Sequence, residues 1–333
     1  MSDAINTTKA VKIQNEKIVR SILRQKREIT ALQLSKLSGL SVATCGNILK
    51  SFVTRGEVFE TETELSTGGR RPRVFKLNLH YEILIGMCIK TEGGKNAIEV
   101  VIANILGEEI ETVCKQLLSI TVDEIILFLE EITKRYPTCT KVAIGIPGVV
   151  RDGQIENCDA PSLAQIDLVS LLRRRFNLSF FIDNELTFSL LGYYREQSYS
   201  APKTIGLLTL VDGHPPGVRF ILDGKPYAGN SNFAGEISLL PVDSNPQELV
   251  RKIHEPKEYL EPVSKILTSI TAVINPHTIV LTGELLRIMD IADIKRKCME
   301  WIPSSHLPQI EIMKDVTQCY FNGLIHVLLD AND

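Results

Sequence analysis

The sequence predicts an α/β protein in which a small helical head precedes a larger body made of two similar halves. Three observations lead to this prediction: helically spaced apolar residues near the start, alternating strand and helix patterns from residue 81 onward, and a charge difference between the two regions. The net charge is only −3 over 333 residues, yet residues 1–80 carry 14 Lys and Arg against 7 Asp and Glu. Residues 81–333 carry 23 Lys and Arg against 33 Asp and Glu. A basic head favours a polyanionic partner, although charge alone leaves a solvated basic face as an open alternative.

The overall composition excludes several other classes of protein. Hydrophobic residues make up 44% of the chain and charged residues 23%, as in ordinary globular proteins and unlike disordered or fibrous ones. No apolar run reaches the roughly 18 residues that a membrane-spanning helix needs, and the first residues lack the apolar core of a secretory signal. The seven cysteines form no CxxC pair, which indicates reduced thiols rather than a disulfide framework or zinc site. We therefore expect a cytoplasmic protein with no membrane partner.

The first 80 residues contain three short helical patterns. Apolar residues recur at helical spacing over residues 15–25, and Thr30 and Ser41 are suitable N-caps for a second and a third helix. Gly39 separates these two helices, and Gly56 ends the third. Such a helix pair joined by a turn that contains glycine is typical of a helix-turn-helix.

Two strand patterns follow the third helix. Residues 57–61 and 73–77 alternate like the strands of a hairpin, and the sequence ELSTGGRRP joins them. Residues 1–80 are therefore predicted to form a winged helix-turn-helix domain. The wing tip is placed at Gly68, Gly69, Arg70, Arg71 and Pro72.

The third helix carries small or polar residues away from its apolar stripe, which would let it enter a major groove. Asn47 is the candidate for reading a base, because an amide can bond adenine through two hydrogen bonds. Lys50, Arg55 and the arginines of the wing are assigned to phosphates or a minor groove. A helical domain that binds protein remains the alternative. The candidate DNA-binding residues are Ser41, Thr44, Asn47, Lys50, Arg55, Arg70, Arg71 and Arg73.

The body shows three strand patterns followed by alternating helices and strands, and this order begins again after residue 204. A duplicated α/β domain produces such an order. In the first half we expect strands at 83–89, 97–103, 109–117, 141–146 and 179–182, and helices at 122–136, 168–176 and 186–194. In the second half we expect a β-rich stretch at 205–222, a helix at 257–274 and a strand at 278–281.

Several short motifs together resemble the ROK family, which includes bacterial repressors, open reading frames and sugar kinases. After the predicted wing come IGIPGVV at 144–150, AGEIS at 234–238 and NPHTIVLTG at 275–283. The predicted head is similar to that of the family's repressor branch. The resemblance implies an actin-like ATPase fold with two lobes around a cleft. One lobe is expected to comprise residues 81–195 plus a C-terminal helix at 318–330, and the other residues 196–317.

The motifs that kinases of this family use are degenerate here. Cys88 stands near the place of an Asp that assists magnesium, and the phosphate turn at 211–219 contains two prolines, which lack N–H donors. Leu239 replaces a His, and no cysteine lies between residues 241 and 255, so we expect no zinc, no other metal and no cofactor. Glu185 stands where the family has its catalytic Asp. The resemblance leaves Gly148, Asn184, Glu185 and Glu236 as remnants of a ligand-binding sugar site.

These observations favour a DNA-binding transcriptional regulator, a repressor of carbohydrate-related genes, over an enzyme. Its partners would be a double-stranded DNA operator, a second copy of the chain in a homodimer or higher assembly, and a sugar or sugar-phosphate effector. Two alternatives stay open. One is a sugar kinase fused to a DNA-binding head, and the other is a body that serves only as a dimerisation scaffold.

Overall fold

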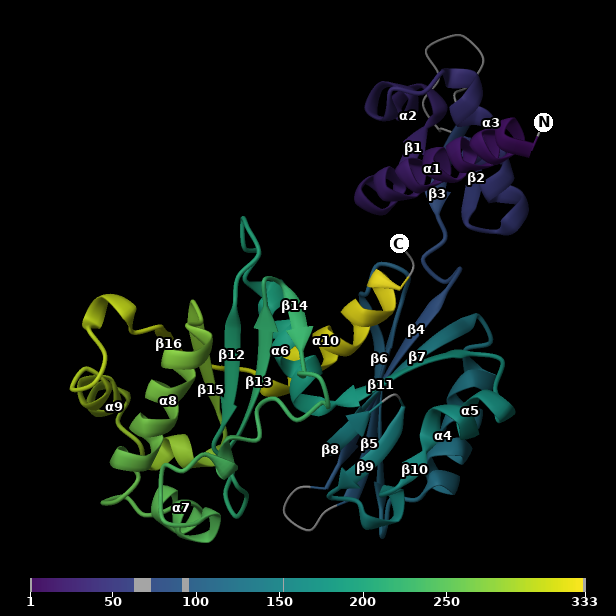
Figure 1. Ribbon diagram of the computed structural model, residues 1–333. Helices are drawn as coiled ribbons and strands as arrows, with labels where there is room; N and C mark the ends of the chain where they lie inside the picture. Colours follow the sequence, from purple (N-terminus) through teal and green to yellow (C-terminus); the bar gives the residue numbers. More distant parts are fainter. Residues whose placement is uncertain (1, 63–72, 92–95, 152, 332–333) are drawn as a thin grey trace.

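The computed structural model describes residues 2–62, 73–91, 96–151 and 153–331. Figure 1 shows a head above two α/β lobes, with helices running between the lobes. The sequence-predicted wing tip, with Arg70 and Arg71, lies outside the described residues. Within the described part, no helix is both long enough and apolar enough to cross a membrane.

Three helices and a three-stranded antiparallel sheet form the head. Strand β3 lies in the middle and pairs with β1 on one side and β2 on the other. The elements are α1 (Ser2–Lys26), β1 (Glu28–Thr30), α2 (Ala31–Ser38), α3 (Val42–Arg55), β2 (Val58–Glu62) and β3 (Arg73–Leu77).

Local sequence signals set the ends of α2 and α3. The Thr30 hydroxyl accepts from the backbone N–H of Gln33, and the Gln33 side-chain oxygen accepts from the backbone N–H of Thr30. The two residues therefore form a capping box. Ser41 caps α3 with its hydroxyl, which accepts from the backbone N–H of Thr44. Gly39 and Gly56 end these helices at φ +73° and +78°, a left-handed conformation that glycine adopts without strain. The four predicted helix boundaries are thereby confirmed.

Helix α1 is longer than predicted. It begins at Ser2 rather than near residue 15, and it is followed by a three-residue strand, β1, that was not expected. The buried face of α1 starts only at Glu16 and Val19, whereas Val11 and Ile13 are exposed. Because the described side chains of residues 10–15 are not buried, apolar periodicity did not detect this part of the helix.

The first lobe has a five-stranded sheet in the order β11-β7-β4-β5-β6. Strands β4, β5 and β6 are antiparallel neighbours, and β7 and β11 run parallel to β4. Helices α4 and α5 pack on one face of the sheet. The elements are β4 (Ile83–Lys90), β5 (Asn96–Ala103), β6 (Glu109–Leu117), α4 (Val122–Arg135), β7 (Cys139–Ile146), α5 (Leu168–Arg175), β11 (Ser179–Asn184) and α6 (Glu185–Glu196).

The second lobe repeats this topology. Its sheet has the order β14-β13-β12-β15-β16, with three antiparallel strands followed by two parallel ones. The duplication predicted from the alternating pattern is therefore present in the two sheets. The elements are β12 (Ile205–Thr209), β13 (Gly217–Leu222), β14 (Lys225–Tyr227), α7 (Pro246–Ile253), α8 (Leu260–Ile274), β15 (Thr278–Thr282), α9 (Ile291–Cys298) and β16 (Gln309–Ile312).

Helices α6 and α10 (Val316–Asp330) connect the lobes. Phe188 of α6 and Leu324 of α10 pack against the first sheet, whereas Leu190 of α6 and Cys319 of α10 pack with residues of the second. In Figure 1 the yellow α10 lies beside α6 between the two sheets. A relative movement of the lobes must therefore act on these two helices.

Short elements account for most of the remaining differences from the sequence prediction. A three-stranded sheet of β8 (Gly148–Arg151), β9 (Gln154–Cys158) and β10 (Ile166–Asp167) was not expected, because strands of two to five residues leave little periodicity. The helix expected at 257–274 begins at Leu260, since residues 255–259 form a separate turn after α7.

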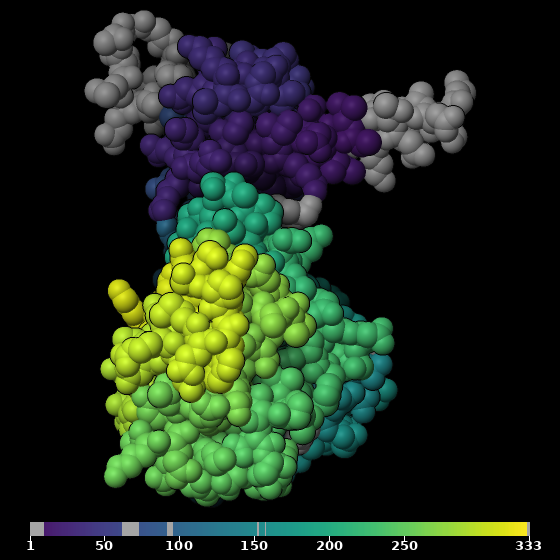
Figure 2. Space-filling view, turned by 60° about the vertical axis from the view of Figure 1, so that its left-hand side comes forward, coloured from purple at the N-terminus to yellow at the C-terminus, as the bar shows by residue number. Residues whose placement is uncertain are grey.

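The head contacts the body through the turn between β5 and β6. Ile105 of this turn is buried in the core of the head, and its N–H donates to the Leu79 carbonyl at 3.3 Å. Glu108 of the same turn pairs with Arg27 at the end of α1. Figure 2 shows the head resting on one end of the body.

Candidate functional site

Helix α3 presents one outward stripe of small and polar side chains. Ala43, Asn47, Lys50 and Thr54 are exposed and recur every three or four residues, so they share one face. The opposite face is buried in the head. Two of the sequence candidates, Asn47 and Lys50, therefore lie side by side on the exposed face of α3.

Ser41 and Thr44 stand at the start of this face. Their hydroxyl oxygens are 2.8 Å apart, and the Ser41 oxygen also accepts from the Thr44 N–H at 3.1 Å. Both side chains thus stabilise the N-terminus of α3. Each hydroxyl can still take part in a further hydrogen bond, because it has one donor and two acceptor sites.

Arg73 and Lys50 line a common groove beside α3. This groove has a volume of about 620 Å³ and also contacts residues of α2. The Arg73 guanidinium forms an ion pair with Glu60 on the neighbouring strand β2, at 2.6 Å. Because about half of the Arg73 side chain is exposed, water and salt screen the pair and Arg73 stays available to an anion.

Arg55 is held inside the head by two carboxylates. Its guanidinium lies 2.7 Å from Glu57 and 3.1 Å from Glu16, both of which are buried. Arg20 approaches Glu57 at 2.8 Å, and this hydrogen bond raises the pKa of Arg20. The two guanidiniums lie 4.8 and 4.9 Å from the ring centre of Phe52. The expected phosphate role of Arg55 thus competes with a structural role at the end of α3.

A second site lies between the two lobes. A cavity of about 210 Å³ is lined on one side by Asp183 and Asn184, at the carboxyl end of β11, and on the other by Arg219 of β13 and Asn232. The Asn232 amide donates to the Val150 carbonyl across the lobes at 3.0 Å. The carboxyl ends of parallel strands are the usual place for ligands in α/β folds.

Asp183 is the most perturbed acid of this cavity. Burial raises the pKa of its carboxyl, and the opposing influences are the Asn184 N–H at 2.6 Å, the charge of Arg219 and the Thr187 hydroxyl at 3.4 Å. Arg219 also lies 3.6 Å from Glu236. One guanidinium therefore stands between two carboxylates of different lobes.

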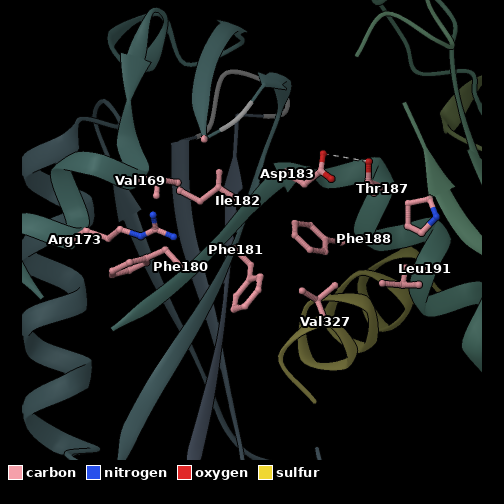
Figure 3. Close-up of a pocket in the computed structure, with 12 residues that line it drawn as sticks. Val169, Arg173, Phe180, Phe181, Ile182, Asp183, Thr187, Phe188, Leu191 and Val327 are labelled. Atoms are coloured by element: carbon pink, nitrogen blue, oxygen red, sulfur yellow. Dashed lines mark hydrogen bonds between the residues drawn. The ribbon is translucent and has the colours of Figure 1, made fainter. Parts of the chain in front are cut away.

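An apolar pocket adjoins the cavity along strand β11. It has a volume of about 370 Å³ and shares Asp183 and Thr187 with the cavity. Figure 3 shows Val169 and Arg173 on one side of the strand and Phe188, Leu191 and Val327 on the other. A ligand in the cleft would thus meet polar groups near Asp183 and apolar groups along the strand.

The four expected remnants of the sugar site take different places. Asn184 lines the cavity, and its amide donates to the Gly148 carbonyl at 2.6 Å. Glu236 reaches the cavity through Arg219. Glu185 is the first residue of α6, and its charge acts on the thiol of Cys88, whose pKa is raised mainly by burial. Asp183, Arg219 and Asn232 were not among the site residues expected from the sequence. Only the position of Asp183 beside Asn184 could have pointed to one of them.

The turn at 211–219, which was expected to have lost its phosphate-binding role, is bonded to other parts of the chain. The Gly213 N–H donates to Nε2 of His254 at 2.8 Å, and the Asp212 N–H donates to Glu284 at 3.3 Å. The next residue, His214, donates to a carbonyl of the same turn, and Pro215 has no N–H. These residues do not fit a nucleotide phosphate. Among the described residues, no three His, Cys, Asp or Glu side chains are grouped to hold a metal ion.

The two matching lobes around a cleft form a mixed α/β fold of the actin-like type. A family model described as the ROK family matches residues 88–250, and this is the family that the sequence motifs resemble. The solved structure of a ROK family transcriptional regulator, a homologue of the E. coli MLC protein, superimposes with a TM-score of 0.63 at 15% identity and covers 96% of this chain and 98% of its own. A ROK family glucokinase from Streptomyces griseus, solved with glucose and AMPPNP, superimposes with a TM-score of 0.55 at 15% identity. The match covers 74% of this chain and 98% of the glucokinase chain.

Curated relatives of this chain are named as sugar-related repressors. The xylose repressor of Caldicellulosiruptor bescii is 29% identical over 67% of this chain and 57% of its own length. The xylose repressor of Bacillus subtilis is 26% identical over 71% of this chain and 62% of its own length. The regulator NagC of Escherichia coli is 23% identical over 72% and 60%. The match thus spans about 60% of the length of these relatives.

Proposed function

We propose that this chain is a cytoplasmic transcriptional regulator that binds operator DNA and represses carbohydrate-related genes. The head acts as a winged helix-turn-helix domain, and α3 enters the major groove. The observation that carries the proposal is the exposed stripe with Asn47 and Lys50 on a net-basic head, joined to a ROK domain whose relatives are named as repressors. Asn47 reads a base, and Ser41 and Thr44 lie close to the groove floor.

The cations of the head divide between phosphate binding and structure. Lys50, Arg70, Arg71 and Arg73 supply affinity through phosphates or a minor groove. Arg55 fixes the end of α3 against Glu16 and Glu57 instead of binding DNA. A homodimer places two heads on half-sites about one helical turn apart, or a multiple of that distance.

The cleft binds the effector, a sugar or sugar phosphate, at Asn184, Asp183 and Arg219, with Gly148, Glu185 and Glu236 around them. Groups from both lobes meet there, so a ligand that bridges them changes the angle between the lobes and moves the head. A coupling free energy of about 1–3 kcal/mol is enough to release DNA.

Selection of duplexes from a random-sequence pool by the purified full chain tests the proposal. We expect a defined sequence to be enriched, with affinity that falls steeply as salt rises, and one member of a panel of sugars and sugar phosphates to weaken it. Absence of salt-sensitive binding to any duplex would contradict the proposal. If no sugar stabilises the chain in a thermal-shift screen, the result would instead favour a body that serves only to pair with a second copy of the chain.

A sugar kinase with a DNA-binding head is the second candidate, because a carboxylate is retained at Glu185. Incubation with MgATP and a hexose panel separates the two. Turnover that disappears in Glu185→Gln would establish the kinase.

A further inference from the structure

Helix α3 is bordered by a groove on each side. The first, described above, lies between α3 and the α2–β3 side and contains Lys50 and Arg73. The second has a volume of about 380 Å³ and lies between α3 and the first half of α1. Its walls include Val11, Lys12 and Asn15 of α1 and Thr44, Asn47 and Ser51 of α3.

We propose that the groove between α1 and α3 seats one sugar-phosphate strand of duplex DNA, with Lys12 as its cation, while the groove at Lys50 and Arg73 seats the other strand. This inference rests on the proposed DNA binding by α3. It assigns a DNA-binding role to the half of α1 that sequence periodicity did not detect.

The dimensions of a duplex support this assignment. A major groove is about 12 Å wide, and an α-helix with its side chains is about 10–12 Å across. A helix that fills the groove therefore has the phosphates of one strand along each flank. Asn47 and Lys50 lie on adjacent parts of the exposed stripe, and they line different grooves of the head.

The charges in the α1–α3 groove suit a polyanion. Lys12 is exposed, and no ion pair among the described residues involves it. The acid of the groove, Glu16, is buried and lies 3.3 Å from Arg20 and 3.1 Å from Arg55, so its charge is neutralised within the head. Among the described residues that line it, the groove thus offers one free positive charge and no free negative one.

The remaining lining residues suit a sugar-phosphate chain better than a small ion. The Asn15 amide and the Ser51 hydroxyl are donors of the kind that contact phosphate oxygens. Val11 is 54% exposed and gives an apolar surface at the same groove, where a deoxyribose can pack. An exposed apolar side chain next to a free lysine matches the alternation of sugar and phosphate along one strand.

The test uses the full chain and the duplex that it selects from a random pool. Lys12→Ala removes the cation of the α1–α3 groove, and Lys50→Ala removes one from the opposite groove. Lys36→Ala is the matched control, because Lys36 is an exposed lysine of α2 that lines neither groove. Binding is measured across a salt series, and ethylation interference identifies the phosphates that matter on each strand.

We expect Lys12→Ala to weaken binding and to make the slope of log affinity against log salt shallower by about 0.9, the value for one lost phosphate contact. Within each half-site, it should abolish ethylation interference on one strand only, Lys50→Ala should do so on the other strand, and Lys36→Ala on neither. The inference is overturned if Lys12→Ala behaves like Lys36→Ala, or if Lys12→Ala changes only the self-association of the chain. Failure of the wild-type chain to bind any duplex would instead contradict the proposed function.

Discussion

Gly192 of α6 lies against Gly323 of α10, at the point where these two helices cross between the lobes. A Cβ atom added to Gly192 would lie 1.8 Å from the Cys319 carbonyl oxygen and 2.8 Å from the Gly323 nitrogen. A Cβ on Gly323 would lie 1.8 Å from the Phe188 carbonyl oxygen. The helices thus approach backbone to backbone, which only glycine at both positions permits.

Gly192→Ala should therefore destabilise the protein by about 3 kcal/mol or more, because a carbonyl of the neighbouring helix cannot move away cheaply. Gly46→Ala is the matched control: Gly46 lies in α3, and a Cβ there would have no atom within 4 Å. Alanine at that position should raise stability by up to about 1 kcal/mol through its higher helix propensity. Urea unfolding of both variants checks the difference, and equal effects would show that the helices are not in contact at the glycines.

A second prediction concerns the contact between head and body. Ile105 is 8% exposed and packs into the core of the head, so Ile105→Ala should cost about 2–5 kcal/mol in the stability of that region. Glu108→Gln should cost much less, because the ion pair of Glu108 with Arg27 is exposed. Hydrogen exchange of the amides of α1 and α3 measures the effect. Ile110→Ala, in an exposed position of β6, is the control and should leave head exchange unchanged.

The predictable parts of the structure were those fixed by local chemistry. Thr30, Gly39, Ser41 and Gly56 mark helix ends through their own side-chain or backbone properties, so their roles could be inferred from single positions. The buried strands of both sheets were found for a similar reason, because each is a continuous apolar run between turns.

Relationships between distant parts of the chain could not be predicted. Arg219 faces Asp183 only because two separate sheets meet at the cleft. The sequence around either residue does not indicate this contact. Arg55 was assigned to phosphate because its charge can be read from the sequence. Its pairing with the buried residues Glu16 and Glu57 cannot be read from the sequence. Family resemblance identified Gly148 and Asn184, which are joined by a hydrogen bond, but not the guanidinium beside them.

A third prediction follows from the raised pKa of Asp183. Because burial raises this pKa above the unfolded value of 3.8, the folded chain holds the proton more tightly, and ionisation lowers stability as pH rises above that value. Asp183→Asn removes this loss, so the variant should become more stable than wild type as pH rises from 4 toward neutrality. Unfolding free energies measured between about pH 3 and 7 test the sign.

Asp167 gives the opposite sign and serves as the control. It caps α5, and its hydrogen bond with Ser170 lowers its pKa below 3.8. Its carboxylate therefore contributes stability above that pH, which is lost as pH falls through the lowered pKa. Asp167→Asn keeps an N-cap but not the charge, so it should lose stability near neutral pH and converge with wild type in acid. The same pH trend in both variants would contradict the assignment for Asp183.

A fourth prediction separates sequence reading from general affinity. Asn47→Ala should cost roughly 1–3 kcal/mol on the selected duplex and almost nothing on random DNA, because a bidentate amide contact discriminates between bases. Arg70→Ala, in the basic segment between the sequences of β2 and β3, should weaken binding to both duplexes and flatten the salt dependence. Competition binding with the selected and random duplexes measures, for each variant, the ratio of its affinities for the two kinds of DNA. Equal losses on both duplexes for both variants would contradict the division.

The last prediction concerns nucleotide. The Gly213 N–H is bonded to His254 and the Asp212 N–H to Glu284, so a phosphate could bind this turn only by displacing both partners. Each hydrogen bond of this kind contributes about 0.5–1.5 kcal/mol, and the prolines that follow supply no further donor. MgATP should therefore leave the thermal midpoint of the chain unchanged, and no ADP should form with any hexose, while a glucokinase assayed in parallel gives both signals. A rise in midpoint with MgATP that His254→Ala increases further would show that the turn opens to phosphate, and the body would then have to be regarded as a nucleotide-binding domain.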